Sequence, residues 1–367
     1  MELPDLDRRG HARDPAQHRR RPSPHAAALT RPHQERQEPM FDLVPDELQR
    51  SVIDSAREVA EATLKEGSAP WAPIADSGLL GLGVAEEAGG VGSGAAEEML
   101  ALVELGAALV DPTVLASMLA AHLLAAEPTL EATADLTLAD VLGGSRRIAL
   151  ADPWHWGFDD RGFDGAATSY RVVLPLGGSA PELAVAVTPD GVALLRLDDV
   201  EVQRGFDRTA PVGRATGTLL GEPDRALLDR ALLLRGALQV GLTRRVLEIS
   251  REHATTRHQF GKPIGSFQAV KHHLAGIAVQ LDASQALVAQ AAVLVDADRS
   301  DPVVARSAAV VAGRCAVDSC RTAIQVHGGI GVTDESDLHV FLRRAHLWEQ
   351  VLGSPDHHEE WVVRHVS

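Results

Sequence analysis

Residues 257–268 combine side chains that can bind a phosphate-bearing ligand. The segment reads Arg-His-Gln-Phe-Gly-Lys-Pro-Ile-Gly-Ser-Phe-Gln and connects two stretches of helical character. The guanidinium of Arg257 can pair with a phosphate through two parallel hydrogen bonds. Gly261 and Gly265 let the backbone turn and allow a ligand to approach it closely. An arginine in a loop is usually only solvated, so this segment alone does not define a site.

A second candidate segment, residues 325–331, reads Gln-Val-His-Gly-Gly-Ile-Gly. Its paired glycines permit a ligand to lie near the main chain, and Gln325 can hydrogen-bond an amide or a ring nitrogen. Two glycines after a helix are usually just its C-cap, so this segment is also weak evidence by itself. We expect His327 to be a packing residue rather than a catalytic base.

Three stretches of different character must position these segments. Residues 40 to about 145 show apolar side chains at helical spacing, with a glycine-dense loop at 76–92. Residues 148 to about 222 contain short β-type runs, two of them joined by a Thr-Pro-Asp-Gly turn at 188–191. From residue 223 the chain reads as consecutive long helices, which indicates a helical bundle. The overall order is therefore α, β, α.

The expected elements have definite limits in the sequence. Helices of the first stretch cover 45–67, 97–110 and 112–126, β runs cover 171–174, 183–187 and 192–197, and bundle helices cover 224–256, 267–298, 301–327 and 338–352. Asp301 and Pro302 are the expected N-cap and first residue of the third bundle helix, and Gly328 follows its end.

The first 39 residues differ in composition from the rest of the chain. They contain eight arginines, six acids, six prolines, four histidines and no aromatic residue, without a helix or strand period. This composition is typical of a disordered segment. The alternatives are an arginine-rich contact patch, a transit peptide, which the acids disfavour, and a translation start at Met40.

Composition and charge disfavour several classes of function. The formal net charge of −16 disfavours nucleic acid as a partner, because phosphate backbones require a positive face. The two cysteines, Cys315 and Cys320, fit neither a zinc site nor a disulfide framework, so we expect no metal and a reducing cytoplasm. We also expect no membrane span, since no segment shows the roughly 18 apolar residues that one requires.

Together, the two candidate segments resemble the acyl-CoA dehydrogenases. The resemblance extends over about residues 40–360 and is strongest over 225–345, where both strings match. It is moderate over 78–106, where Gly-Leu-Leu-Gly-Leu and Glu-Ala-Gly-Gly match a loop of the family, and weak in the β module. It implies an α+β fold. The implied parts are a tail or mis-assigned start at 1–39, an N-terminal helical domain at 40–147, a small β domain at 148–222 and a C-terminal four-helix bundle at 223–367.

The resemblance also implies an FAD cofactor and an acyl-CoA substrate, with electron transfer flavoprotein as the oxidant. Arg257 would hold the FAD pyrophosphate, Gln259 and Phe260 would line its ADP part, and Gln325 would contact it. In this family these groups serve the FAD of a neighbouring subunit, so an oligomer is implied as well. The complete set implied to bind the cofactor is Arg257, Gln259, Phe260, Gln268, Gln325, Gly328 and Gly329.

The catalytic base of the family is missing at both of its usual positions. The reaction removes a proton α to a thioester and passes a hydride from the β carbon to the flavin, which requires a carboxylate base. In most members a glutamate follows the last bundle helix, and Leu352 stands there. In a minority the base lies on the first bundle helix, where Ala231 stands. Asp229 and Glu349 are close to these positions in the sequence and are the candidates for a displaced acid.

The β module departs from the family as well. Leu-Ala-Asp-Pro at 150–153 stands where the family has a loop that contacts the flavin ring. A second flavin-contacting strand is not recognisable, although Trp154 and Trp156 lie nearby. We therefore do not expect the β domain of this chain to hold a complete flavin by itself.

This combination resembles one subset of the family, the actinobacterial heterotetrameric enzymes of sterol side-chain degradation. In that subset, one subunit type supplies the base and much of the flavin site, and the other has lost the base. The chain is similar to the second type, which implies an FAD site shared with a second family member. Two alternatives stay open: a homomeric enzyme that uses a displaced acid, and a binding or scaffold protein without redox chemistry.

Overall fold

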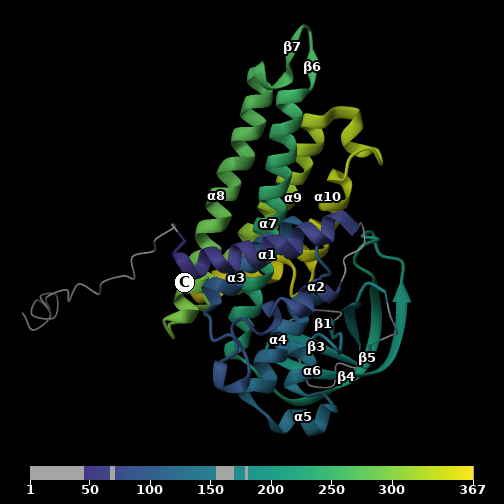
Figure 1. Ribbon diagram of the computed structural model, residues 1–367, viewed down its shortest axis with the longest axis vertical. Helices are drawn as coiled ribbons and strands as arrows, with labels where there is room; N and C mark the ends of the chain where they lie inside the picture. The colour runs from purple at the N-terminus through teal and green to yellow at the C-terminus, as the bar shows by residue number, and fades with distance from the viewer. Residues whose placement is uncertain (1–44, 67–70, 154–168, 178–180, 367) are drawn as a thin grey trace, which may run out of the picture. The chain divides into compact units, whose positions relative to one another are not determined.

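The computed structural model describes residues 45–66, 71–153, 169–177 and 181–366, and helices dominate these ranges (Figure 1). The predictions for residues 1–39 and for Trp154 and Trp156 concern residues outside them. The helices that precede the first strand are α1 (Glu47–Glu66), α2 (Trp71–Asp76), α3 (Ala95–Ala107), α4 (Thr113–Ala126), α5 (Thr129–Ala134) and α6 (Leu138–Leu142).

The N-terminal helices share a core because α4 is apolar on nearly every side. All residues from Thr113 to Ala121 are buried, which requires neighbours around the whole helix. The predicted glycine-dense loop at 76–92 contains two 3₁₀ turns, Leu79–Gly81 and Glu86–Ala88. The three helices predicted here correspond to α1, α3 and α4, with ends that differ by at most three residues.

The central β module is a small closed barrel. Around it the strands follow the order β1-β2-β5-β4-β3, in which β1 and β3 pair in parallel and the other neighbours are antiparallel. The predicted turn at 188–191 joins β3 to β4, with Thr188 opposite Gly191. The strands are β1 (Ala149–Pro153), β2 (Tyr170–Val173), β3 (Leu183–Thr188), β4 (Gly191–Gln203) and β5 (Val212–Asp224).

Two strands and half of a third were not predicted from the sequence. β1 is only five residues long and ends in a proline, and β5 contains Gly213 and Gly217, which interrupt its alternation. β4 continues to Gln203 rather than ending near residue 197, and its second half is polar and largely exposed. The backbone pairing of β4 with β5, rather than burial of side chains, extends these strands.

Helices resume after the barrel as α7 (Ala226–Thr256), α8 (Gln268–Asp296), α9 (Pro302–His327), α10 (Leu338–Gln350) and α11 (Pro355–Val366). α7 is the central one and packs against α3, α8 and α9. Asp301 caps α9 by accepting a hydrogen bond from the Val303 amide at 2.8 Å, as predicted. α11 was not predicted; it packs on α9. The architecture is the α+β arrangement that the sequence indicated, with helices before and after a small barrel in the chain.

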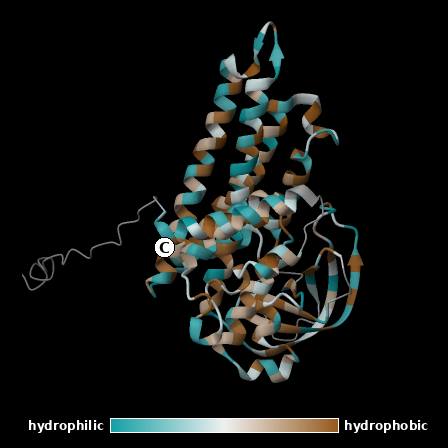
Figure 2. Ribbon diagram, viewed as in Figure 1, coloured by the Kyte–Doolittle hydropathy of each residue, from teal (hydrophilic) through white to brown (hydrophobic). Residues whose placement is uncertain are grey.

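α7 and α8 run side by side to a two-stranded hairpin, β6 (His258–Gln259) with β7 (Lys262–Pro263) (Figure 1). The two strands of the hairpin are hydrophilic, whereas the helices beneath it carry both polar and apolar residues (Figure 2). The predicted connection between the first two bundle helices is therefore the outer end of this helical pair.

Within the described residues, α8 is the one helix long and apolar enough to cross a membrane by length and composition alone. About 33% of its most apolar window is buried inside the structure, where α8 packs on α7 and α9. Length and composition do not establish a span, so the expectation that the chain has none stays a prediction.

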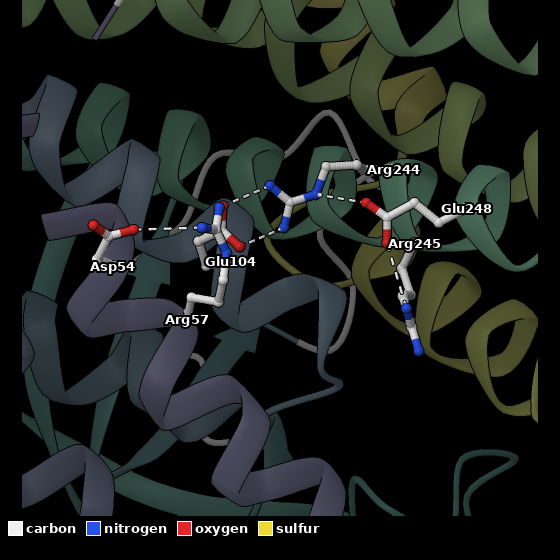
Figure 3. A network of polar contacts seen from close by, with 6 residues as sticks. All are labelled: Asp54, Arg57, Glu104, Arg244, Arg245 and Glu248. Carbon is white, nitrogen blue, oxygen red and sulfur yellow. Dashed lines mark hydrogen bonds and ion pairs between the residues drawn. The ribbon is translucent and has the colours of Figure 1, made fainter. Parts of the chain in front are cut away.

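An ion-pair network joins α1, α3 and α7 (Figure 3). Glu104 of α3 is largely buried and accepts from both Nη atoms of Arg244 at 2.7 Å, a bidentate geometry. Arg57 of α1 reaches the same carboxylate at 3.3 Å. The flanking acids Asp54 and Glu248 contact these arginines from the surface. The network holds the N-terminal helices α1 and α3 against α7 of the bundle.

Candidate functional site

The hairpin between α7 and α8 presents its polar side chains outward. Arg257 and Gln259 are exposed, and the ring of Phe260 is 91% exposed. Phe260 has a φ of +52° and Gly261 a φ of +78°, so the tip is a tight turn with a bulky residue in the left-handed region. Such a strained, exposed aromatic residue is a candidate contact for a ligand or a partner.

Within the hairpin, packing leaves the tip available. The ammonium of Lys262 lies 4.4 Å from the centre of the Phe267 ring, and Phe260 meets the same ring edge-on at 6.1 Å. The backbone is held by the Ile264 amide, which donates to the Arg257 carbonyl at 2.8 Å. Across the described part of the chain, the hydrogen bonds of Arg257 are made by its backbone and not by its guanidinium. The side chain can therefore serve an external anion.

The second candidate segment ends α9. Gln325 is exposed, and Gly328 has φ 63° and ψ −138°, a conformation essentially restricted to glycine. Gly329 differs, because a Cβ atom built there would meet nothing within 4 Å and its φ is not positive. The fold of this chain therefore does not require glycine at 329. An approaching ligand or neighbouring molecule would explain the missing side chain.

Two stacked histidines bring the two segments together. The rings of His253, one turn before Arg257, and His327, two residues after Gln325, lie 4.0 Å apart with planes inclined at 21°. The Nδ1 atom of His327 donates to the Ala323 carbonyl at 2.9 Å. Burial lowers the pKa of both rings, and the charges of His327 and Arg257 lower that of His253 further. Both rings therefore stay neutral near pH 7, which permits close stacking, and the buried His327 packs here.

The residues at the two predicted base positions are buried. Leu352 is 0% exposed and Ala231 is equally buried, and neither can accept a proton. Asp229 accepts a hydrogen bond from the Ser300 hydroxyl at 2.6 Å, and burial raises the pKa of its carboxyl. Glu349 contacts the His346 ring at 3.2 Å. Among the described residues, neither acid is hydrogen-bonded to the segment around Leu352.

Residues Gln350, Val351, Leu352 and Gly353, here called the 350–353 turn, are bound by side chains from four elements. The Leu352 amide donates to Asp152 Oδ2 of β1 at 3.0 Å. The carboxylate of Asp152 is also paired with Arg171 of β2, with Nε to Oδ1 at 2.9 Å. Arg171 in turn donates to the Gln350 carbonyl.

Two further side chains hold the same turn from the bundle. Arg235 of α7 donates through Nη1 to the carbonyls of Val351 at 2.6 Å and Gly353 at 3.1 Å. Burial lowers its pKa to about 10. His358 of α11 donates through Nε2 to the Leu352 carbonyl at 2.8 Å. Sequence reasoning missed these residues, although a lone arginine inside the apolar run at 231–238 is a visible signal.

The hydrogen bonds of His358 assign its tautomer. Arg306 can only donate, and its Nη1 lies 2.9 Å from His358 Nδ1, so Nδ1 accepts and Nε2 carries the proton. The ring is therefore neutral. Burial and the charges of Arg235 and Arg306 hold the pKa of His358 well below its usual range.

This assignment predicts an acid-sensitive fold. In the unfolded chain the pKa of His358 returns to about 6.5, so the unfolded state binds the proton first as the pH falls. Stability is then fully present above about pH 6.5 and is lost below it, by about 1.4 kcal/mol between pH 7.5 and 5.5 for this one group. Urea unfolding at both pH values measures the free energy of unfolding. Its difference between pH 7.5 and 5.5 should be smaller for His358→Gln than for the wild type. The same difference in both proteins would contradict the assignment, and His272→Gln, on the exposed face of α8, is the matched control.

Two family models match most of the chain. The model described as "Acyl-CoA dehydrogenase, N-terminal domain" matches residues 34–135, and "Acyl-CoA dehydrogenase, C-terminal domain" matches residues 226–367. The chain is 32% identical over 280 residues to the acyl-CoA dehydrogenase IpdE2 of Mycobacterium tuberculosis, an alignment that covers 76% of this chain and 80% of the relative.

Two solved structures have the same fold. A variant of the Tcur3481-Tcur3483 steroid ACAD superposes with a TM-score of 0.72 at 23% identity and covers 87% of this chain and 98% of its own. The ChsE4-ChsE5 complex from Mycobacterium tuberculosis superposes with a TM-score of 0.70 at 24% identity and covers 89% and 99%. At these identities the likeness establishes the fold alone.

Proposed function

This chain belongs to the acyl-CoA dehydrogenase family of FAD-dependent oxidoreductases, and from that premise we propose that it is the subunit of a heteromeric enzyme that lacks the base and completes its partner's FAD site. The enzyme would remove hydrogen from the α and β carbons of an acyl-CoA thioester. The base and most of the flavin site would come from a second family member. The proposal has two parts. The first is that the 350–353 turn lacks the base, and the second is that Arg257 and its neighbours bind the partner's FAD.

A single contrast carries the proposal. The residues that the resemblance assigns to dinucleotide binding are exposed, and the stacking of His253 on His327 brings their two segments together, whereas Leu352, which the resemblance puts at the position of the base, is buried. A chain that catalyses the reaction alone would need an accessible carboxylate beside the reacting carbon, rather than a buried leucine. A chain that supports a neighbouring site needs only the outward face.

The residues of that face fit an FAD pyrophosphate and adenosine. Arg257 supplies a planar fork of donors for phosphate oxygens, and Gln259 and Gln325 supply amide donors and acceptors. The exposed ring of Phe260 offers an apolar surface, and Gly328 and Gly329 leave the main chain open to close approach. Gln268, exposed in the first turn of α8, extends the same set. FAD, when bound, supplies the hydride acceptor, and this chain contributes binding and orientation.

Substrate and oxidant follow from the family. We infer an acyl-CoA substrate with a bulky, steroid-type acyl group, because one solved structure of this fold is described as a steroid ACAD. The ChsE4-ChsE5 complex supports a partner from the same family. Electron transfer flavoprotein is the inferred oxidant, and a cytoplasmic location is the inferred compartment.

The test is the flavin content of the purified protein, alone and with its partner. The chain is produced alone and co-expressed with an acyl-CoA dehydrogenase that has the glutamate base, and visible absorbance and mass are measured. We expect a colourless product alone and a yellow complex with one FAD for every two chains. One FAD per chain in the protein alone, with turnover abolished by Asp229→Ala or Glu349→Ala, would favour a homomeric enzyme instead. A stable complex without flavin would favour a scaffold.

A further inference from the structure

We propose that His253 is a positioning residue of the cofactor-binding face. Its neutral ring, stacked on His327, holds the hairpin after α7 and the segment that ends α9 at one fixed separation, and protonation of the pair releases them. This inference rests on the proposed function and deepens it. The proposed function names the residues that contact the partner's FAD, whereas the stack determines whether both segments reach one cofactor together. His253 itself does not touch the cofactor in this proposal.

Each of the two rings lies in the last turn of its helix. His253 is four residues before Arg257, and the Arg257 amide donates to the His253 carbonyl at 2.9 Å. His327 is two residues after Gln325 and directly before the paired glycines. The rings lie 4.0 Å apart with planes inclined at 21°. The stack therefore joins two helix ends at the residues next to the proposed cofactor contacts.

The main chain beyond each helix is folded back onto the end of that helix. A Cβ atom added at Gly265 would lie 2.9 Å from the carbonyl oxygen of Ala254, the residue after the first stacked histidine. A Cβ atom added at Gly331 would lie 2.8 Å from the Ile324 carbonyl oxygen and 3.1 Å from the Cβ atom of His327. Glycine at both positions permits this close packing. Each segment is thereby fixed to its own helix end, and the stacked rings connect the two ends.

The two rings are held in different ways. His327 is buried, and its Nδ1 atom donates to the Ala323 carbonyl at 2.9 Å, which fixes the plane of the ring. The ring of His253 is half-buried and makes no hydrogen bond or ion pair among the described residues. Its stacking on His327 is the contact that orients it. A substitution at 253 therefore removes the stack without removing a hydrogen bond.

Stacking at this distance requires that the two rings are not both charged. Burial and the positive charges of His327 and Arg257 lower the pKa of His253. Burial also lowers the pKa of His327, and the hydrogen bond to the Ala323 carbonyl opposes part of that shift. In the described part of the chain no carboxylate pairs with either ring, so two protonated rings would repel each other without compensation. Protonation would therefore separate the two segments.

Most of the other titratable groups on the surrounding elements are basic. The last two turns of α7 and α9, the hairpin, and the first two turns of α8 and α10 carry Arg251, Glu252, His258, Lys262, Lys271, His272, His273, Arg321, His339 and Arg343. A basic surrounding adds to the cost of a second proton on the pair. The exposed histidines of the hairpin and α8 gain charge as the pH falls, which favours a phosphate ligand and opposes release. A loss of affinity at low pH therefore cannot come from them.

Substitutions at 253 test the positioning through FAD titration of the flavin-free, co-expressed complex. His253→Ala removes the ring, and we expect FAD to bind about three- to tenfold more weakly at pH 7.5. His253→Phe keeps a ring that can stack, so we expect its affinity to stay within about twofold of the wild type. Thr255→Ala changes an exposed residue of the same helix turn and should have no effect. An unchanged affinity for His253→Ala, or an equal loss for His253→Phe, would overturn the positioning.

The pH profile gives a readout that simple packing would not change. Protonation at 253 begins below about pH 6.5, and phenylalanine has no proton to gain. Between pH 7.5 and 5.0 the affinity of the wild type should therefore fall about threefold more than that of His253→Phe. The surface histidines are the same in both proteins, so they cancel in this comparison. A constant ratio of the two affinities would overturn release by protonation.

The two proposals can fail separately. A wild-type complex that binds no FAD would overturn the proposed function, and the positioning with it. A wild-type complex that binds FAD, with the same affinity in His253→Ala, would keep the function and overturn the positioning. If His253→Ala does not assemble, the comparison of the wild type with His253→Phe across pH still decides the question.

Discussion

Replacement of Arg257 by alanine is expected to weaken FAD binding by the assembled enzyme by about 10- to 100-fold. A charge-assisted, bidentate hydrogen bond to phosphate contributes about 1.5–3 kcal/mol, and alanine removes both donors and the charge. The hairpin should keep its conformation, because the hydrogen bonds to His253 and Ile264 are made by the backbone of Arg257 and not by its side chain. Titration of the flavin-free complex with FAD, followed by flavin fluorescence, measures the effect.

Two further variants sharpen this experiment. Arg257→Lys keeps the positive charge and loses the planar fork, so it should fall between the wild type and alanine. Arg251→Ala removes an exposed arginine from α7, the helix that precedes Arg257, and should leave the affinity unchanged. An unchanged dissociation constant for Arg257→Ala would remove this residue from the cofactor site.

Replacement of Asp207 by alanine is expected to destabilise the chain by about 3–5 kcal/mol. Asp207 Oδ2 accepts from Arg344 Nε at 2.6 Å, and both side chains are only 2% exposed. Arg344 also donates to the carbonyls of Val110 at 2.7 Å and Thr209 at 3.0 Å. Without Asp207 the guanidinium would stay buried as an uncompensated charge. Chemical denaturation at pH 7.5 measures the loss as a lower midpoint at unchanged slope.

A surface ion pair provides the control for this prediction. Asp318 and Arg321 lie 3.5 Å apart with side chains more than half exposed. Asp318→Ala should therefore change stability by less than about 0.5 kcal/mol. A loss below about 1 kcal/mol for Asp207→Ala would show that water or a local rearrangement compensates Arg344.

The long helices could be predicted because their signals are local. α7, α8 and α9 begin and end within two residues of their predicted limits, and Asp301 caps α9 as expected. Apolar spacing and capping residues depend only on near neighbours in the chain. β5 and α11 carry weaker signals. β5 is interrupted by glycines, and α11 has three histidines and three acids among its 12 residues.

The candidate site was predictable in residue types but not in arrangement. The two segments with Arg257 and Gln325 were singled out from their strings, and the absence of the base at Leu352 stays a prediction. Their apposition comes from the packing of α7 against α9, which brings His253 and His327 together and which no short-range pattern contains. The assignment of individual cofactor-binding residues stays a prediction until the titrations above are made.

By itself, the sequence determined the α, β, α order and the family, because these depend on residue identity and local spacing. Only the tertiary structure decided how Leu352, the residue predicted at the position of the base, is held. Asp152 and Leu352 are 200 residues apart in the chain, and their hydrogen bond exists only because the barrel and the bundle pack together. Burial then makes that contact costly to break, since the Leu352 amide would lose its hydrogen-bond acceptor while out of water. The hydrogen bonds of the 350–353 turn are therefore a property of packing rather than of any segment of sequence.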